Sequence, residues 1–274
     1  MMSSQDKLDL ARRIAEKFEG FSSVEAIGLG GSLAGGETDA HTDIDLYIYT
    51  HETIPLRKRQ ELVEDLGASR ADMNLTFWDL GDQWFDKASG TEVDLIYWDP
   101  QWIGDEIIKV VEKHQASMGY TTCFWRTINE TRILSDRNAW LADLKSNCDI
   151  PYPSALQRAI VEKNHPVLRL VIPSYYNQVK KALDRGDLVS LNHRVAAFLA
   201  SYFDILFAVN GVLHPGEKKM LKFATSHCDV LPGDFEVKIN TLFREAGGNS
   251  PGVLVALDSL TDDLEAILLA KDLI

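Results

Sequence analysis

The stretch Gly30-Gly31-Ser32, followed after ten residues by Asp43-Ile44-Asp45-Leu46-Tyr47-Ile48, guides the interpretation of the whole chain. Side chains alternate along a strand, so the two aspartates share one face while the aliphatic residues between them enter an apolar layer. Two like charges on one face repel each other, and hard divalent cations such as Mg²⁺ bind one or two carboxylates together with phosphate oxygens. The pattern therefore predicts a metal site with Asp43 and Asp45 as ligands.

A glycine-rich turn precedes this strand. Val24 to Leu29 is typical of a first strand, and the glycines that follow, Gly30 and Gly31, let the backbone approach a ligand closely. The N–H groups of such a turn form an anion-binding nest, to which the Ser32 hydroxyl adds a donor. We expect Gly31 and Ser32 to bind the phosphates of a nucleoside triphosphate.

The spacing between Gly31-Ser32 and Asp43-x-Asp45 resembles the signature of the DNA polymerase β-like nucleotidyltransferase superfamily. A lone Gly-Ser or Asp-x-Asp is common, so the information lies in the gap and in the apolar strand. The resemblance implies an α+β fold class, with a mixed sheet and flanking helices. It also implies two Mg²⁺ ions and an NTP, with ATP expected, as co-substrate. A glycine-rich hairpin with acidic residues capping a strand is the alternative.

The third acidic position lies in a later apolar strand, Thr91 to Trp98, where Glu92 and Asp94 fall on one face. We expect this strand to lie beside the Asp43 strand, where such an acid can complete a metal site or take the proton from an attacking hydroxyl. The lincosamide and streptomycin/spectinomycin nucleotidyltransferases resemble this chain at Glu92, and the polymerase-like and kanamycin-type members at Asp94. Both residues are therefore candidates, with Asp94 favoured as a metal ligand and Glu92 as the base. An edge strand with a polar outer face is the alternative.

The charge balance limits the range of partners. The chain has 28 Lys and Arg against 41 Asp and Glu, a net charge of -13. Binding to a polyanion needs a basic stripe, and none is evident. We therefore expect a small-molecule acceptor or a protein, and not a long nucleic acid.

Cysteine usage and hydropathy indicate the compartment. The three cysteines have neither a disulfide nor a zinc spacing. No apolar run reaches membrane-spanning length, and the first residues lack the apolar core of a signal peptide. We expect a cytoplasmic protein without a membrane partner. The sequence does not indicate its oligomeric state.

Further elements follow from periodicity and from turn residues. We predict helices over 3–20, 55–66, 101–118 and 139–145, a loop over 78–84 and a strand over 127–134. The cluster Arg57-Lys58-Arg59 is interpreted as a solvated helix face. Pro151 and Pro153 indicate a linker, which predicts a nucleotidyltransferase catalytic domain over 1–150 and a helical-bundle, substrate-binding domain over 151–274. Kanamycin-type and related antibiotic nucleotidyltransferases have a similar architecture.

The helical half contains a candidate cation. Its predicted helices cover 154–164, 166–185, 187–209, 215–225, 233–245 and 251–271. Pro215-Gly216 would begin the fourth of them, which places Lys218 in its first turn. A helix N-terminus favours anions, so Lys218 is predicted to contact the β or γ phosphate. A solvated helix start is the alternative.

Together these features predict an enzyme that transfers a nucleoside monophosphate, with AMP expected, from Mg-NTP to a hydroxyl of a small acceptor such as an antibiotic, releasing pyrophosphate. Two alternatives stay open. One is a protein-modifying nucleotidyltransferase, similar to antitoxins that adenylylate a partner, and the other is a non-catalytic nucleotide-binding module.

Overall fold

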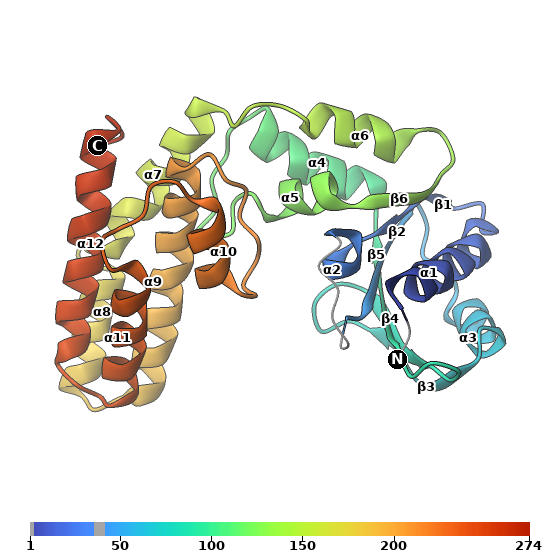
Figure 1. Cartoon of the computed structure of the whole chain (residues 1–274), viewed down its shortest axis with the longest axis horizontal. Helices are drawn as coiled ribbons and strands as arrows, with labels where there is room; N and C mark the ends of the chain where they lie inside the picture. Colours follow the sequence, from blue (N-terminus) through green and yellow to red (C-terminus); the bar gives the residue numbers. More distant parts are fainter. Residues whose placement is uncertain (1–2, 36–41) are drawn as a thin grey trace. The chain divides into compact units, whose positions relative to one another are not determined.

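The computed structural model describes residues 3–35 and 42–274, and it divides into two compact units. One unit comprises Met1–Ile108 with Thr127–Ile150, and the other Lys109–Arg126 with Pro151–Ile274 (Figure 1). The second unit therefore includes a segment that precedes the predicted linker. The assignment of a catalytic role to 1–150 and of substrate binding to 151–274 stays a prediction.

The first unit is built on a six-stranded mixed sheet with strand order β3-β4-β5-β2-β1-β6. Only the central pair, β2 and β5, is parallel; the other four pairings are antiparallel. The strands are β1 (Val24–Leu29), β2 (Ile44–Thr50), β3 (Ala68–Leu75), β4 (Gly81–Asp86), β5 (Glu92–Trp98) and β6 (Arg132–Asp136). The predicted mixed sheet with flanking helices is thus confirmed.

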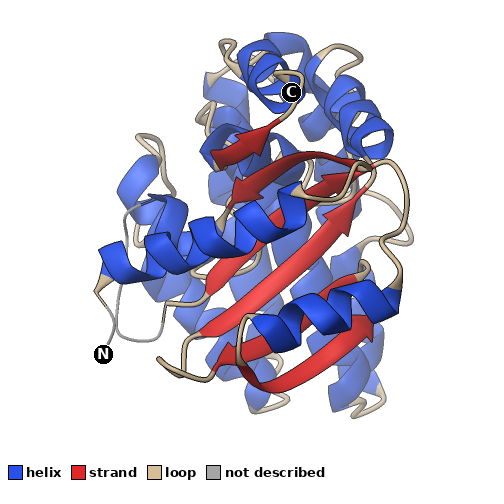
Figure 2. Cartoon of the chain, turned by 90° about the vertical axis from the view of Figure 1, so that its right-hand side faces the viewer, coloured by secondary structure: helices blue, strands red, loops and turns tan. Residues whose placement is uncertain are grey.

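Helices α1 (Ser4–Glu19) and α3 (Leu56–Asp65) cover one face of this sheet, which we call the back face (Figure 2). Ser3 caps α1 and forms a capping box with Asp6. The apolar stripe of α1 packs onto the strand side chains that point to the back face. The core formed there includes Ile14, Phe18, Ile44, Leu46, Val93 and Leu95. The front face, on the other side, carries the acidic residues of β2 and β5.

Aromatic side chains pack together at one end of the front face. Tyr49 packs against Trp140 with ring centroids 5.0 Å apart, and Trp98 against Trp102 at 6.0 Å. These partners belong to α6 (Trp140–Cys148) and α4 (Pro100–Val111). The acidic residues lie at the other end of the same strands, near where β2 and β5 begin.

The second unit contains the remaining long helices. They are α7 (Ser154–Leu168), α8 (Tyr175–Asp184), α9 (Leu188–Val209), α10 (Met220–His227), α11 (Phe235–Gly247) and α12 (Gly252–Ala270). Buried hydrogen bonds attach the early segment to this bundle: the Thr121 hydroxyl donates to Asp204 at 2.7 Å, and the Gly119 N–H donates to Asn164 at 3.0 Å. The predicted helical region is confirmed.

Several local predictions were wrong. Residues 127–134 are not one strand, because α5 (Cys123–Glu130) ends before β6 begins; Trp125 and Ile128, three residues apart, are its buried positions. Residues 78–84 are not all loop, since β4 begins at Gly81. The expected helix over 166–185 is divided between α7 and α8, and α4 ends at Val111.

The interpretation of Arg57-Lys58-Arg59 as a solvated face was also wrong at one position. Arg59 is fully buried and donates to Asp82 at 2.5 Å, to the Ile54 carbonyl and to Asn74. The sequence conceals this because Asp82 lies in the stretch that we interpreted as loop. An unpaired buried charge costs several kcal/mol, so the pair must form together with the sheet.

Candidate functional site: an acidic cluster beside a glycine turn

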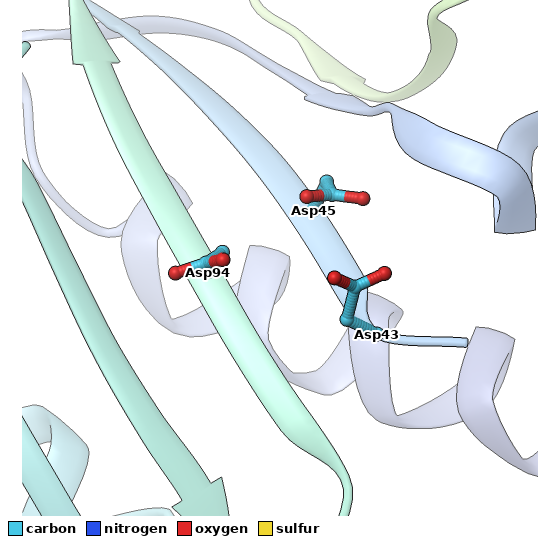
Figure 3. Close-up of side chains that lie close together, drawn as sticks. All are labelled: Asp43, Asp45 and Asp94. Carbon is cyan, nitrogen blue, oxygen red and sulfur yellow. The ribbon is translucent and has the colours of Figure 1, made fainter. Parts of the chain in front are cut away.

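Three aspartates meet on the front face of the sheet (Figure 3). Asp45 lies opposite Asp94 in the parallel pairing of β2 and β5. Asp43 comes just before β2 and falls on the same face as Asp45, because side chains two residues apart in extended chain point the same way. One carboxylate oxygen of each aspartate lies within 4.8 Å of the others, and all three side chains are half-buried. The parallel pairing of β2 and β5 thus brings the carboxylates of Asp43, Asp45 and Asp94 close together.

The donor set of this cluster suits a hard divalent cation. Carboxylate oxygens are the ligands of Mg²⁺, and two oxygens on opposite sides of one Mg²⁺ ion lie about 4.2 Å apart. The cluster spacing of up to 4.8 Å is close to that value. Three carboxylates at such distances repel one another, and a bound cation relieves the repulsion. The residues therefore fit a metal ion, although their role as ligands stays a prediction.

The glycine turn lies directly against this cluster. Gly31 has φ +61°, and a Cβ built on it would lie 1.8 Å from Oδ2 of Asp45. The N–H of Gly30 donates to the Asp45 carbonyl at 2.9 Å, and a Cβ on Gly30 would meet the Tyr47 ring at 2.4 Å. Any side chain at Gly31 would thus displace the carboxylate of Asp45. Glycine is needed at these two positions because β2 lies close to them, which the sequence alone did not reveal.

Ser32 follows in the short helix α2 (Gly31–Gly35). Its side chain is exposed, and its hydroxyl lies 3.5 Å from the hydroxyl of Thr42. Ser32 therefore stands next to the start of the acidic strand. Phosphate binding by Gly31 and Ser32 stays a prediction.

Glu92 is separated from the aspartate cluster. It lies on the front face two residues before Asp94, and it accepts a hydrogen bond of 2.5 Å from Nε2 of Gln83. Glu92 also lines a small pocket of about 180 Å³, formed by Arg70, Asp72, Gln83, Trp84, Phe85 and Glu92. Within the part of the chain that the structure describes, the only acidic group close enough to share a metal contains Asp94 and not Glu92. The two acids of β5 thus have different surroundings.

Three further residues near the cluster escaped the sequence analysis. Gln83 lies opposite Asp94 in the β4–β5 pairing, and it was missed because β4 was interpreted as loop. Tyr47 stacks on Trp98 at 4.6 Å, and burial together with the charges of Asp45 and Glu130 raises its pKa. Lys7 is buried and donates to the Thr42 carbonyl. A lysine on the apolar stripe of the first helix was the signal that could have identified it.

Lys218 belongs to the helical unit. It is exposed and lies in the turn before α10, which begins at Met220 and not at Pro215. The prediction that Lys218 occupies the first turn of a helix was therefore wrong. Its role in nucleotide binding stays a prediction.

No protein-family model matches the chain, and no curated protein does. Among solved structures it is similar to a nucleotidyltransferase-like protein from Exiguobacterium sibiricum, at 11% identity and a TM-score of 0.44, over 96% of this chain and 74% of that one. It is also similar to a CCA-adding enzyme complexed with ATP, at 11% identity and a TM-score of 0.33, over 98% and 83% of the two chains.

A third similar structure is a CCA-adding enzyme from Thermotoga maritima complexed with tRNA, at 12% identity and a TM-score of 0.31, over 96% of this chain and 81% of that one. These likenesses are loose, so the function is inferred below from the aspartate cluster and its glycine turn. No helix in the described ranges combines the length and apolar character needed to cross a membrane.

Proposed function

We propose that this protein is a nucleotidyltransferase that transfers a nucleoside monophosphate from Mg-NTP, with ATP expected, to an acceptor hydroxyl. The observation that carries the proposal is the contact between two sequence motifs. Asp43, Asp45 and Asp94 gather on one face, and Gly31 lies so close to Asp45 that only a glycine fits there. A cation site and a backbone turn able to receive phosphate are thus adjacent.

The chain's own residues have separate tasks in this proposal. Asp43, Asp45 and Asp94 would hold the divalent cation, and the turn at Gly31 and Ser32 would bind the triphosphate. The metal supplies charge neutralisation on the phosphates and polarises the oxygens that react. The remaining catalysis comes from alignment of the two substrates on a preorganised surface.

The sheet order supports a direction of attack. Phosphoryl transfer needs the attacking and leaving oxygens roughly in line with the phosphorus. The strand order β3-β4-β5-β2-β1-β6 puts the cluster on the two middle strands, with the glycine turn on the β1 side and the Glu92 pocket on the β3–β4 side. If pyrophosphate leaves toward the turn, the acceptor must approach from the pocket.

Glu92 is then our candidate for the general base. A base must reach the acceptor proton without being occupied by the metal, and Glu92 lies outside the group that contains Asp94. The hydrogen bond from Gln83 holds its carboxylate in place. Asp94 is accordingly assigned as a metal ligand.

A small-molecule acceptor fits the pocket and the charge better than a polyanion does. The pocket is small and contains Arg70, Asp72 and Glu92, and the whole chain carries a net charge of -13. A hydroxylated ligand with a cationic group matches these acids. Protein acceptors and tRNA, the latter bound by one of the similar structures, are outcomes that the experiment must be able to detect.

The test is incubation with α-labelled ATP and Mg²⁺ in the presence of hydroxylated antibiotics, cell lysate protein or tRNA. Label transferred to a small molecule, with pyrophosphate release that the Asp43→Asn protein lacks, is the expected result. Label on protein or on tRNA would show that the acceptor is a macromolecule and not a small molecule. Absence of transfer to every acceptor, with ATP still bound, would favour the non-catalytic binding module.

A further inference from the structure

Lys7 is a buried lysine whose ammonium group lies beside the first residue of the acidic strand. It belongs to α1, and its side chain is almost completely buried among the apolar residues of that helix. Its Nζ donates a hydrogen bond of 2.7 Å to the main-chain carbonyl of Thr42. Thr42 is the residue directly before Asp43.

The burial of an ammonium group at this position needs an explanation. Transfer of a charge into an apolar layer is costly, and an aliphatic residue would pack against the sheet without that cost. The hydrogen bond to the Thr42 carbonyl offsets part of that cost, because it pairs a buried donor with an acceptor. Thr42 precedes β2, whose described pairing with β5 begins at Ile44. Lys7 thus supplies a donor where that pairing has not yet begun.

Thr42 is held from two directions. Its carbonyl accepts from Lys7, and its hydroxyl lies 3.5 Å from the Ser32 hydroxyl in α2. The Thr42 carbonyl belongs to the same planar peptide group as the Asp43 nitrogen, so fixing that oxygen also fixes the direction in which Asp43 enters the strand. Asp43 has no position of its own within the β2–β5 pairing. The hydrogen bond from Lys7 to Thr42 therefore contributes to the position of Asp43 in the cluster.

We propose that Lys7 is a positioning residue for the metal site, which holds the Thr42–Asp43 peptide so that the Asp43 carboxylate meets those of Asp45 and Asp94. The inference rests on the proposed function, because it assumes that the aspartate cluster binds a cation.

The test measures Mn²⁺ affinity by electron paramagnetic resonance, in the absence of nucleotide. Residues that orient metal ligands typically change metal affinity by roughly 10- to 100-fold when they are replaced. We expect Lys7→Met to weaken Mn²⁺ binding at least about tenfold. Lys7→Gln, which keeps only a shorter neutral donor, should weaken Mn²⁺ binding by less than Lys7→Met does, whereas Lys7→Arg, which keeps donor and charge, should bind as the wild type does. If Lys7→Met does not fold, the weaker binding of Lys7→Gln relative to Lys7→Arg carries the test.

Lys145 offers a matched control within the same unit. Its Nζ also donates to main-chain carbonyls, those of Ile128, Asn129 and Thr131, at 2.6 to 2.9 Å. Lys145→Met should lower thermal stability and leave Mn²⁺ affinity unchanged. A purely structural role for Lys7 would give the two methionine variants the same behaviour, and that result would overturn the inference.

The failure of this inference is distinguishable from failure of the proposed function. If Asp43→Asn leaves Mn²⁺ affinity unchanged, the metal site itself is refuted. If Asp43→Asn loses Mn²⁺ while folded Lys7→Met, Lys7→Gln and Lys7→Arg all bind as the wild type does, only the role of Lys7 is refuted. Reduced affinity in Lys7→Met or Lys7→Gln, with Lys145→Met unaffected, supports it.

Discussion

The carboxylates on the two faces of the sheet have opposite surroundings. On the back face, Asp82 is fully buried and accepts from Arg59, from the Tyr97 hydroxyl at 2.6 Å and from the Asn74 N–H at 2.8 Å. On the front face, three half-buried aspartates approach one another within 4.8 Å. The first arrangement satisfies a charge internally, whereas the second concentrates charge of one sign.

This difference separates a structural acid from a candidate functional one. A buried carboxylate with a cation and two further donors is part of the folded core, so its loss should lower stability. Clustered carboxylates do not stabilise the fold, because like charges repel.

The largest effect is expected for Asp43→Asn and Asp45→Asn. Each removes a charged ligand, so nucleotidyl transfer should fall by at least roughly a thousandfold, or about 4 kcal/mol of transition-state stabilisation. Stability should stay unchanged or rise slightly, since one repelling charge is gone. Pyrophosphate release and urea unfolding measure the two quantities. Near wild-type turnover in either variant would refute the metal-site assignment.

Arg59→Met should show the opposite behaviour. It leaves Asp82 buried without its cation, which should cost about 3–5 kcal/mol of unfolding free energy. Adding Asp82→Asn to this variant should recover part of the loss, because the uncompensated charge is removed. Urea unfolding of the single and double variants provides the measurement. A loss below about 1 kcal/mol in Arg59→Met would mean that the pair resembles a surface ion pair.

Glu92→Gln and Asp94→Asn should differ from each other in kind. Loss of a general base lowers turnover by roughly a hundredfold or more with metal affinity kept, whereas loss of a ligand lowers Mn²⁺ affinity as well. Steady-state kinetics combined with Mn²⁺ titration separates the two. If both variants lose Mn²⁺ binding equally, Glu92 is a ligand and not the base.

Asp204 in the helical unit provides a third type of acid, with neutral donors. Thr121 donates to it twice, at 3.0 and 2.7 Å, while burial raises its pKa to about 7. A raised carboxyl pKa stabilises the fold at low pH, and that stability is lost as pH rises toward the folded pKa. Relative to Asp204→Asn, the wild type should therefore lose roughly 2 kcal/mol between pH 5 and 7.

The wild type must be compared with Asp204→Asn because His214 changes the stability of the fold with pH in the opposite direction. Burial lowers the pKa of His214 to about 4, so its contribution to stability is lost as pH falls from the unfolded value toward 4. The difference between wild type and variant cancels this effect. A difference that does not change between pH 5 and 7 would show that Asp204 stays ionised in the fold.

The sequence predicted the parts of this protein that depend on local pattern. Alternation along β2 and β5 placed the acids on shared faces, and the capping residues gave the bounds of α1. The expected adjacency of the Asp43 strand and the Thr91–Trp98 strand is confirmed by the pairing of β2 with β5. The other neighbours could not be predicted, because strand pairing is a long-range property. The exclusion of Glu92 from the cluster depends on the register of β2 against β5, and the partners of Arg59 and Lys7 are likewise residues distant in the sequence.

β4 illustrates the limit. Its first residues, Gly81 and Asp82, are typical of a turn when the sequence is considered alone. In the sheet, Asp82 points to Arg59 on the back face and Gln83 points to Glu92 on the front face. Each polar side chain is explained only by a residue distant in the sequence, so no local rule identifies the strand.

The most direct test of the central claim is a crystal structure of the protein with Mn²⁺ and a non-hydrolysable ATP analogue, recorded at a wavelength where manganese scatters anomalously. We predict an anomalous peak at coordination distance, about 2.2 Å, from oxygens of Asp43, Asp45 and Asp94, with the triphosphate against Gly31 and Ser32. Nucleotide bound elsewhere, or nucleotide at this place with no manganese at the three aspartates, would contradict the account.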